Sequence, residues 1–345
     1  MVVNRSGRQV TMTDVATAAG VSIATVSRAL SGTRPMSEEL RGTVLETAEQ
    51  LGYQVNLVGR TLRQRRSSTV GLIVPDLDNP FFSSLAQSLS RTFTPSGIEL
   101  LVFSADSNLD IENRGVRSFL GRQVDALVVI ATHERRSASN VAIATQSVVT
   151  IELDRKVASP EAHFVGCDNK YGMRLIHEHV VQDVDVESQP VVFVGGTKES
   201  SSGRERLTAF RRWFGDRPTF LGSFDVNWGQ RAAEDLLAAG MTRGTVIAAA
   251  DVIALGLLSR LHTAGFRVPE DFRVIGFDGI GVSYLAHPTL TTVRQPVEEM
   301  SQAILDMVIH GASGVSASSR TRLFRPTFVY GESSPRGQDG TQPGE

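Results

Sequence analysis

From Val70 onward, short β-rich runs alternate with amphipathic helical stretches. The runs are VGLIVP, ELLVFSA, ALVVIA, VVTIEL, FVGCD, PVVFVG, TFLGSF, TVIAAA and RVIGFD. Such alternation specifies βαβ units and a parallel, doubly wound sheet, because a parallel strand needs a crossover helix before the next strand. The runs fall into two sets, which predicts two similar α/β lobes.

Residues 11–52 have a different pattern, which predicts three short helices. Thr13 can cap the first helix, and Gly20 occupies the position where that helix stops. Ser22 can cap the second helix and Ser37 the third. About two residues separate the first two helices, so they must cross steeply in the manner of a helix-turn-helix.

Charge divides the chain at the same place. Residues 1–66 hold nine Arg and no Lys against five acidic residues, a net charge of +4, whereas the remainder has a net charge of -6. The chain has 345 residues, enough for two or three domains, and 41% of them are hydrophobic, enough for a sizeable core. A basic head on an acidic body predicts a polyanionic partner at the head alone.

Several function classes find no support in the sequence. The single cysteine, Cys167, cannot form an intrachain disulfide, which fits a cytoplasmic protein. We expect neither secretion nor membrane insertion, because there is no apolar signal region and no run of about 20 apolar residues. Nucleotide-binding and hydrolase motifs are missing, and His177 and His179 point to different faces of a helix. We therefore expect no enzymatic activity, no metal and no cofactor.

The predicted second helix, residues 23–30, carries side chains suited to reading DNA. In a helix-turn-helix this helix lies in the major groove, where hydroxyls reach phosphates, apolar groups touch thymine methyls and arginine can pair with guanine. The candidate DNA contacts are Thr13, Ser22, Ile23, Ala24, Thr25, Ser27 and Arg28. By spacing alone, a capped three-helix bundle could also be only a small stable domain.

The amino-acid sequence of the head favours DNA binding. The string T-x-x-D-V-A-x-x-A-G-V-S-x-A-T-V-S-R-x-L at residues 11–30, with S-E-E-L-R and L-G-Y within residues 37–53, closely resembles the LacI family of bacterial repressors. The resemblance extends over about residues 10–334, and TVRQP at residues 292–296 matches the family's third crossover. It implies an all-α helix-turn-helix head plus an α/β periplasmic-binding-protein-like core of two Rossmann-like lobes.

The resemblance includes a hinge in the basic linker, where NLVGRTLR begins at Asn56. In the family, this segment forms a short helix that wedges a leucine into the minor groove. Leu62 would be the wedge here, and Asn56 and Arg60 would contact the DNA backbone. The alternative is that Leu62 is an ordinary linker residue. Val55 and Gly59 replace the usual proline and alanine, and glycine costs about 1 kcal/mol in a helix interior.

The resemblance also implies a ligand clamped in a cleft between the lobes. Ligands of open α/β sheets bind beyond the carboxyl ends of the strands, so residues that follow the β runs are candidates. The candidate effector contacts are Asp76, Phe81, Phe82, Ser202, Arg206, Trp228, Asp251 and Asp278. We expect one of the two phenylalanines to be a core residue instead. Arg204 is a weaker candidate, with a surface salt bridge as its alternative role, and Asp154 is equally compatible with the cleft and with loop structure.

An arginine fork that faces a carboxylate suits vicinal hydroxyls, so we expect a small neutral sugar such as a pentose, or a nucleoside. Ala250 occupies the family's asparagine site, which removes one polar contact. The resemblance implies a homodimeric repressor that an effector releases from a palindromic DNA operator, with no membrane partner. A corepressor-type regulator, which binds DNA better with ligand, is the alternative.

A sugar-transport protein would share the body but not the basic head. The expected domains are a DNA-binding head at 1–57, a hinge at 58–68, an effector-binding and dimerisation domain at 69–334 (first lobe about 69–165 and 294–318, second lobe about 166–293 and 319–334) and a disordered tail at 335–345.

Overall fold

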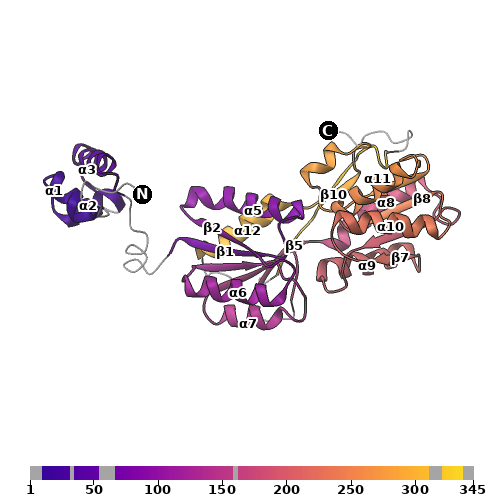
Figure 1. The fold of residues 1–345 in the computed structure, drawn as a ribbon, viewed down its shortest axis with the longest axis horizontal. Coiled ribbons are helices and arrows are strands. Elements are labelled where there is room, and N and C mark those ends of the chain that lie inside the picture. The colour runs from indigo at the N-terminus through magenta and orange to yellow at the C-terminus, as the bar shows by residue number, and fades with distance from the viewer. Residues whose placement is uncertain (1–9, 32–34, 54–66, 158–161, 311–320, 337–345) are drawn as a thin grey trace. The chain divides into compact units, whose positions relative to one another are not determined.

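A computed structural model describes residues 10–31, 35–53, 67–157, 162–310 and 321–336, and it divides the chain into two units after Ser67 (Figure 1). The predicted hinge contacts Asn56, Arg60 and Leu62 lie outside the described residues, as does most of the predicted tail. In the described part of the chain, no helix is long and apolar enough to cross a membrane.

The first unit contains three helices: α1 (Met12–Ala18), α2 (Ile23–Ser31) and α3 (Glu38–Gln50). They enclose a small core in which the side chains of Val15, Val26 and Val44 are fully buried. The predicted helix-turn-helix is therefore confirmed.

The prediction that Thr13 caps the first helix is wrong. Thr11 is the N-cap: its hydroxyl accepts a hydrogen bond from Asp14 N at 3.4 Å, and Asp14 Oδ2 accepts one from Thr11 N at 2.8 Å. Asp14 stands three residues after Thr11, the spacing that allows this reciprocal capping box. The other local predictions hold, since Ser22 Oγ accepts from Thr25 N and Ser37 Oγ from Leu40 N.

In the second unit, the first lobe is built on a six-stranded parallel sheet. Its strand order is β11-β5-β4-β3-β1-β2. The helices α5 and α12 pack together on one face, and α6 and α7 pack together on the other (Figure 1). The elements are β1 (Thr69–Val74), α5 (Pro80–Phe93), η1 (Thr94–Ser96), β2 (Glu99–Ser104), α6 (Leu109–Gly121), β3 (Ala126–Val129), α7 (Ala138–Thr145), β4 (Val149–Leu153), β5 (His163–Cys167), α12 (Val297–His310) and β11 (Thr321–Phe324).

The second lobe has a four-stranded parallel sheet of order β7-β6-β8-β9. Helix α8 packs against α9, and α10 against α11, while β10 and β12 form an antiparallel pair. The elements are α8 (Asn169–Asp183), β6 (Val191–Gly195), α9 (Ser201–Phe214), β7 (Thr219–Leu221), α10 (Val226–Ala238), β8 (Gly244–Ala248), α11 (Asp251–Thr263), β9 (Phe272–Ile275), η2 (Gly281–Leu285), β10 (Thr292–Arg294) and β12 (Thr327–Val329).

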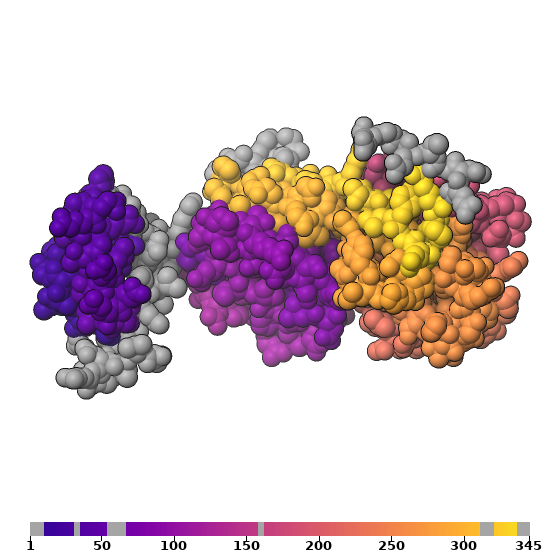
Figure 2. Space-filling view, turned by 90° about the horizontal axis from the view of Figure 1, so that it is seen from above, coloured from indigo at the N-terminus to yellow at the C-terminus, as the bar shows by residue number. Residues whose placement is uncertain are grey.

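The expected lobe boundary at residue 319 is wrong. Strand β11 pairs with β5 of the first sheet, with Thr321 opposite Phe164 and Phe324 opposite Cys167. Strand β5 leaves one edge open after pairing with β4, and β11 satisfies the backbone groups of that edge. The chain therefore returns to the second lobe only after Phe324, and its last segments lie on both lobes (Figure 2).

Candidate DNA-reading helix and effector cleft

The predicted DNA contacts lie mainly on the exposed side of α2. Ile23 is 49% exposed, and Ser22, Ala24 and Arg28 are also exposed, whereas Val26 is buried in the core of the head. Thr25 and Ser27 are half-buried, and Thr13 is exposed on α1.

Local hydrogen bonds order this surface. Ser22 Oγ lies 2.9 Å from Thr25 Oγ1, and Arg28 Nη2 donates to Thr25 Oγ1 at 3.4 Å. Hydroxyls and one guanidinium therefore stand together at the start of the helix, where phosphate and base-edge contacts are made in the major groove.

Arg206 is the centre of a buried polar cluster in the second unit. Its side chain, on α9, is 2% exposed and stacks 3.8 Å from the ring centroid of Phe277. Its Nε donates to Asn169 Oδ1 at 2.8 Å, and its Nη1 donates to Ala249 O at 2.6 Å and to Asp278 Oδ1 at 3.1 Å. The guanidinium is thus fixed in plane and direction, as recognition of a defined ligand requires.

Two carboxylates flank Arg206, one from each lobe. Asp278, from the second lobe, also accepts from Gln295 Nε2 at 2.8 Å, and burial raises its pKa to about 7 against the opposing effect of Arg206. Asp154 follows β4 of the first lobe and lies 4.0 Å from Arg206 Nη2. Ser202 Oγ donates to Asp154 Oδ2 at 3.4 Å. The cluster therefore joins the two lobes.

Arg155 is a second buried cation in the cleft. Its guanidinium lies 5.2 Å from the ring centroid of Phe82 in the first lobe and 5.4 Å from that of Phe224 in the second. Its Nη1 donates to Ala131 O at 3.3 Å, and desolvation lowers its pKa from the usual value. The two aromatic rings and the guanidinium form a stacked wall across the lobe boundary.

Four buried polar atoms of the cleft have no hydrogen-bond partner within the described residues: Thr132 Oγ1, Asp154 Oδ1, Arg155 Nε and Gln295 Oε1. A buried polar atom without a hydrogen bond costs about 1–3 kcal/mol, so these atoms are candidate contacts for a ligand. Asp154 Oδ1 and Arg155 Nε also take part in ion pairs, with Arg206 at 4.0 Å and with Asp154 Oδ2 at 3.9 Å. Two of them accept hydrogen bonds only, one donates only, and the hydroxyl does both. A matching ligand must therefore donate and accept.

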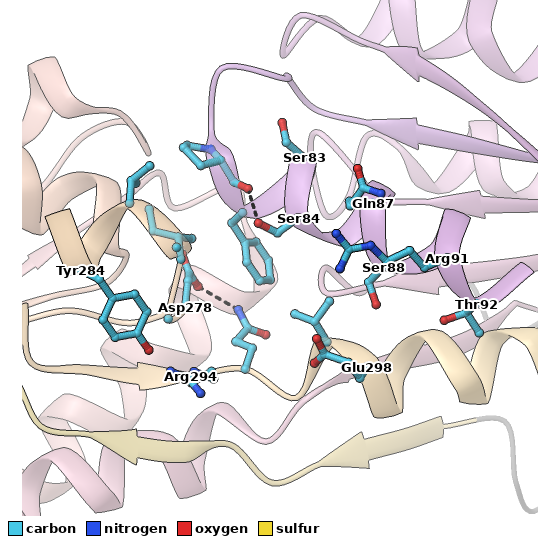
Figure 3. A pocket seen from close by; sticks show the side chains of 18 residues that line it. Ser83, Ser84, Gln87, Ser88, Arg91, Thr92, Asp278, Tyr284, Arg294 and Glu298 are labelled. Atoms are coloured by element: carbon cyan, nitrogen blue, oxygen red, sulfur yellow. Dashed lines mark hydrogen bonds between the residues drawn. The ribbon is translucent and has the colours of Figure 1, made fainter.

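A cavity lies at each end of the cluster. One, of about 1100 Å³, is lined by Asp76, Thr132, Arg155 and Phe224. The other, of about 1040 Å³, is lined by Phe81, Asp278 and Gln295 and by a polar stripe of α5, and Figure 3 shows Asp278 on its wall, opposite Ser84 and Gln87. Small ligands bind in clefts of this kind, where a few polar groups converge.

Of the residues that the sequence nominates, Arg206 bonds to Asp278, and Ser202 bonds to Asp154 beside them. Phe81 and Asp278 line one cavity and Asp76 lines the other, and a role of these residues in effector binding stays a prediction. Both phenylalanines are buried in the core of the first lobe, and Phe81 also lines a cavity. Phe82 lines neither cavity and packs against Arg155, so the expectation that one of the two is a core residue holds for Phe82.

Trp228 does not lie in the cleft. It is 9% exposed, its Nε1 donates to Gly195 O at 2.9 Å, and its ring packs against Gly222. The aromatic side chain of this region that reaches the cavity is Phe224, four residues earlier. Trp228 is therefore a packing residue of α10.

Asp251 is also turned away from the cleft. Its side chain is fully buried; Oδ1 accepts from Thr292 Oγ1 at 2.5 Å, and Oδ2 accepts from Ile280 N and Ser283 Oγ, both at 2.9 Å. Burial raises its pKa to about 6, and these hydrogen bonds oppose that rise. These contacts anchor η2, and Asp251 lines neither cavity.

The sequence reasoning missed Arg155, Phe224, Gln295 and Asn169. Gln295 stands within the TVRQP segment and Arg155 directly follows Asp154, so both were adjacent to residues already singled out.

Within the described residues, no group of three or more His, Cys, Asp or Glu side chains could hold a metal ion.

A three-helix head with an exposed reading helix, joined to a two-lobed α/β unit with a polar cleft, defines the class of ligand-responsive DNA-binding regulators. Residues 11–56 match the model of bacterial regulatory proteins of the lacI family, and residues 188–334 match that of the periplasmic binding protein-like domain. The chain therefore carries a DNA-binding domain of the lacI family and a periplasmic binding protein-like domain, and it is a DNA-binding transcriptional regulator. The predicted family and fold class are confirmed.

Relatives match over most of their length. A ribose operon repressor of Halalkalibacterium halodurans is 28% identical over 306 residues, 87% of this chain and 89% of that protein. The HTH-type transcriptional regulator AscG of Escherichia coli is 29% identical over 313 residues, 88% of this chain and 92% of that protein. A lac repressor dimer bound to operator and an anti-inducer has the same fold, with a TM-score of 0.82, 23% identity and coverage of 95% of this chain and 100% of that chain.

Proposed function

We propose that this protein is a repressor that binds a palindromic operator as a homodimer and is released by a neutral sugar, with a pentose such as ribose as the specific candidate. The observation that carries the proposal is the buried cluster around Arg206, where hydrogen-bonding groups from both lobes converge beside two cavities that further donors and acceptors line. Hydroxyls of a sugar both donate and accept, so a sugar can bond to both kinds of group.

Charge favours a ligand without phosphate or carboxylate groups. The cavity beside Arg155 is lined by five carboxylates, Asp76, Asp78, Asp110, Glu199 and Asp225, against two arginines, Arg136 and Arg155. Arg206 is already neutralised by Asp278 at 3.1 Å. An anionic ligand would therefore enter a cavity whose carboxylates outnumber its arginines by five to two.

The relatives support the same ligand class. Ribose operon repressors of two species match this chain, at 28% and 26% identity. Structures of similar fold were solved with other polyols, cellobiose on CelR and myo-inositol on a Caulobacter binding protein. A pentose such as ribose is the narrower candidate because ribose operon repressors are among these relatives.

The proposed mechanism is allosteric. Binding of the sugar strengthens contacts between Arg206 of one lobe and Asp154 of the other, which favours closure of the cleft. Closure shifts the first lobes across the dimer interface, and the hinge segment then loses its hold on the minor groove. The protein acts in the cytoplasm, where it meets its operator.

A gel shift with the DNA upstream of the protein's own gene tests the proposal. We expect a shifted band that ribose abolishes at concentrations where ribose 5-phosphate and an unrelated hexose do not. A stronger shift with ribose would replace release by corepression, and a complete lack of shift under every condition would overturn DNA binding itself. Thermal stabilisation by ribose, measured in parallel, shows whether the sugar binds at all.

A further inference from the structure

A loop of the first lobe touches the second lobe at the start of α9. Glu134 N donates to Glu199 O at 2.9 Å, and the Glu134 carboxylate forms a salt bridge with the Arg204 guanidinium. Nearby, Lys156 N donates to Ser201 Oγ at 2.7 Å. These contacts span the lobe boundary.

The loop that carries Glu134 is held rigidly by a fully buried carboxylate. Glu112 Oε2 accepts from Thr132 N at 2.8 Å and from Ser137 Oγ at 2.9 Å, and its Oε1 accepts from Asn140 Nδ2 at 2.8 Å. Both ends of the loop from 132 to 137 are therefore fixed to α6. A rigid support of this kind presents the Glu134 carboxylate at a constant position, so the pair with Arg204 forms when the lobes approach.

Arg204 is two residues from Arg206 on the same helix, and its side chain points elsewhere. The side chain of Arg204 is 48% exposed and that of Glu134 is 20% exposed, whereas Arg206 is buried. Helix α9 thus carries Arg206, which binds within the cleft, and Arg204, which forms a salt bridge with the opposite lobe outside the cleft.

We propose that the Arg204–Glu134 salt bridge and the Glu134 N–Glu199 O hydrogen bond form an interlobe clasp that holds the cleft closed and sets how long the effector stays bound. The proposal rests on the proposed function only in the identity of the effector. Both residues are positioning residues. Because the contacts of the clasp join the two lobes, separation of the lobes must break them, so the clasp stabilises the closed state and slows dissociation of the effector.

The size of the effect follows from the exposure of the pair. Solvent-exposed ion pairs change an equilibrium constant by about fivefold at most, and salt screens them. Removal of the salt bridge should therefore raise the dissociation rate of ribose about two- to fivefold at low salt and less at high salt. The association rate should change little.

The experiment uses the full-length protein with Arg204→Gln, Glu134→Gln and the charge-swapped pair Arg204→Glu with Glu134→Arg. Arg211→Gln, on the exposed far end of the same helix, is the matched control. Hydrogen exchange of the peptide spanning 132–137 is measured without sugar. The dissociation rate of ribose is measured separately by stopped flow. We expect faster exchange and faster dissociation in both single variants, recovery in the swapped pair, and wild-type values in the control.

Unchanged exchange in Arg204→Gln, or a swapped pair no closer to wild type than the single variants, overturns the clasp. Faster exchange in a protein that binds no ribose upholds the clasp and overturns ribose as the effector. The two proposals therefore fail separately.

Discussion

Replacement of Arg206 by methionine tests whether the buried cluster is an ion pair held within the fold. Methionine fills a similar volume but removes the cation that faces Asp278 at 3.1 Å and the donors to Asn169 and Ala249. Asp278 would keep Gln295 as its side-chain donor. The variant thus leaves a carboxylate buried without its counter-ion.

Removing one member of a buried ion pair costs about 3–5 kcal/mol, whereas replacing both members by neutral groups costs far less. We therefore expect Arg206→Met to lower the free energy of unfolding by about 3–5 kcal/mol at pH 8, and Arg206→Met with Asp278→Asn to recover most of that loss. A domain stability of about 10 kcal/mol, the middle of the usual range, leaves the single variant folded.

The pH dependence has a definite sign. Asp278 has a folded-state pKa of about 7, above its ordinary value of 3.8, and loss of Arg206 raises that pKa further. The folded variant therefore takes up a proton as the pH falls through this range, so the cost of Arg206→Met is largest at pH 8 and smaller at pH 6. The Asp278→Asn double variant should show no such change.

Urea unfolding followed by tryptophan fluorescence measures these differences. The two tryptophans of the chain, Trp213 and Trp228, both lie in the lobe that contains Arg206. A decrease in the free energy of unfolding of less than about 1 kcal/mol in the single variant would refute the ion pair as described. So would a double variant whose decrease equals the sum of the decreases in the two single variants.

Three further predictions concern the head and the hinge. Thr11→Ala should speed hydrogen exchange of α1 in the full chain by removing an N-cap worth about 1 kcal/mol, while Thr13→Ala should leave it near wild type. Arg28→Ala should weaken binding to an operator with guanine at the contacted position by about 1–3 kcal/mol and relax the preference at that position in a gel-shift series. Leu62→Ala should weaken operator binding without changing ribose affinity, and the opposite pattern would contradict the division between hinge and cleft.

Sequence reasoning succeeded where a short pattern determines the structure. The alternation of β-rich runs and helices specified both lobes, and Ser22 and Ser37 were recognisable as caps from their place before helical spacing. It failed at Thr13 because two threonines compete near the start of α1, and the carboxylate of Asp14 decides between them by its distance from Thr11. That choice depends on side-chain geometry.

The cleft was harder to predict because backbone turns decide which way each side chain points. Asp225 caps α10 and accepts from Trp228 N at 2.7 Å, which turns Trp228 toward Gly195 and leaves Phe224 to reach the cavity. Both aromatic residues follow β7 in the sequence, so position alone could not separate them. Sequence position alone could not place the Asp251 side chain for a similar reason, because η2 folds over its carboxylate.

Backbone strain provides independent support for the cleft. Asp154 and Asp278 have φ angles of 60° and 122°, in a region that residues other than glycine rarely adopt. Each such conformation costs about 1–3 kcal/mol and persists only where surrounding contacts hold it. At Asp278 those contacts are Asp278 N to Val293 O at 2.8 Å and Gln295 N to Asp278 O at 3.1 Å. Both strained carboxylates face Arg206 from opposite lobes, so the strain lies where a ligand would join the lobes.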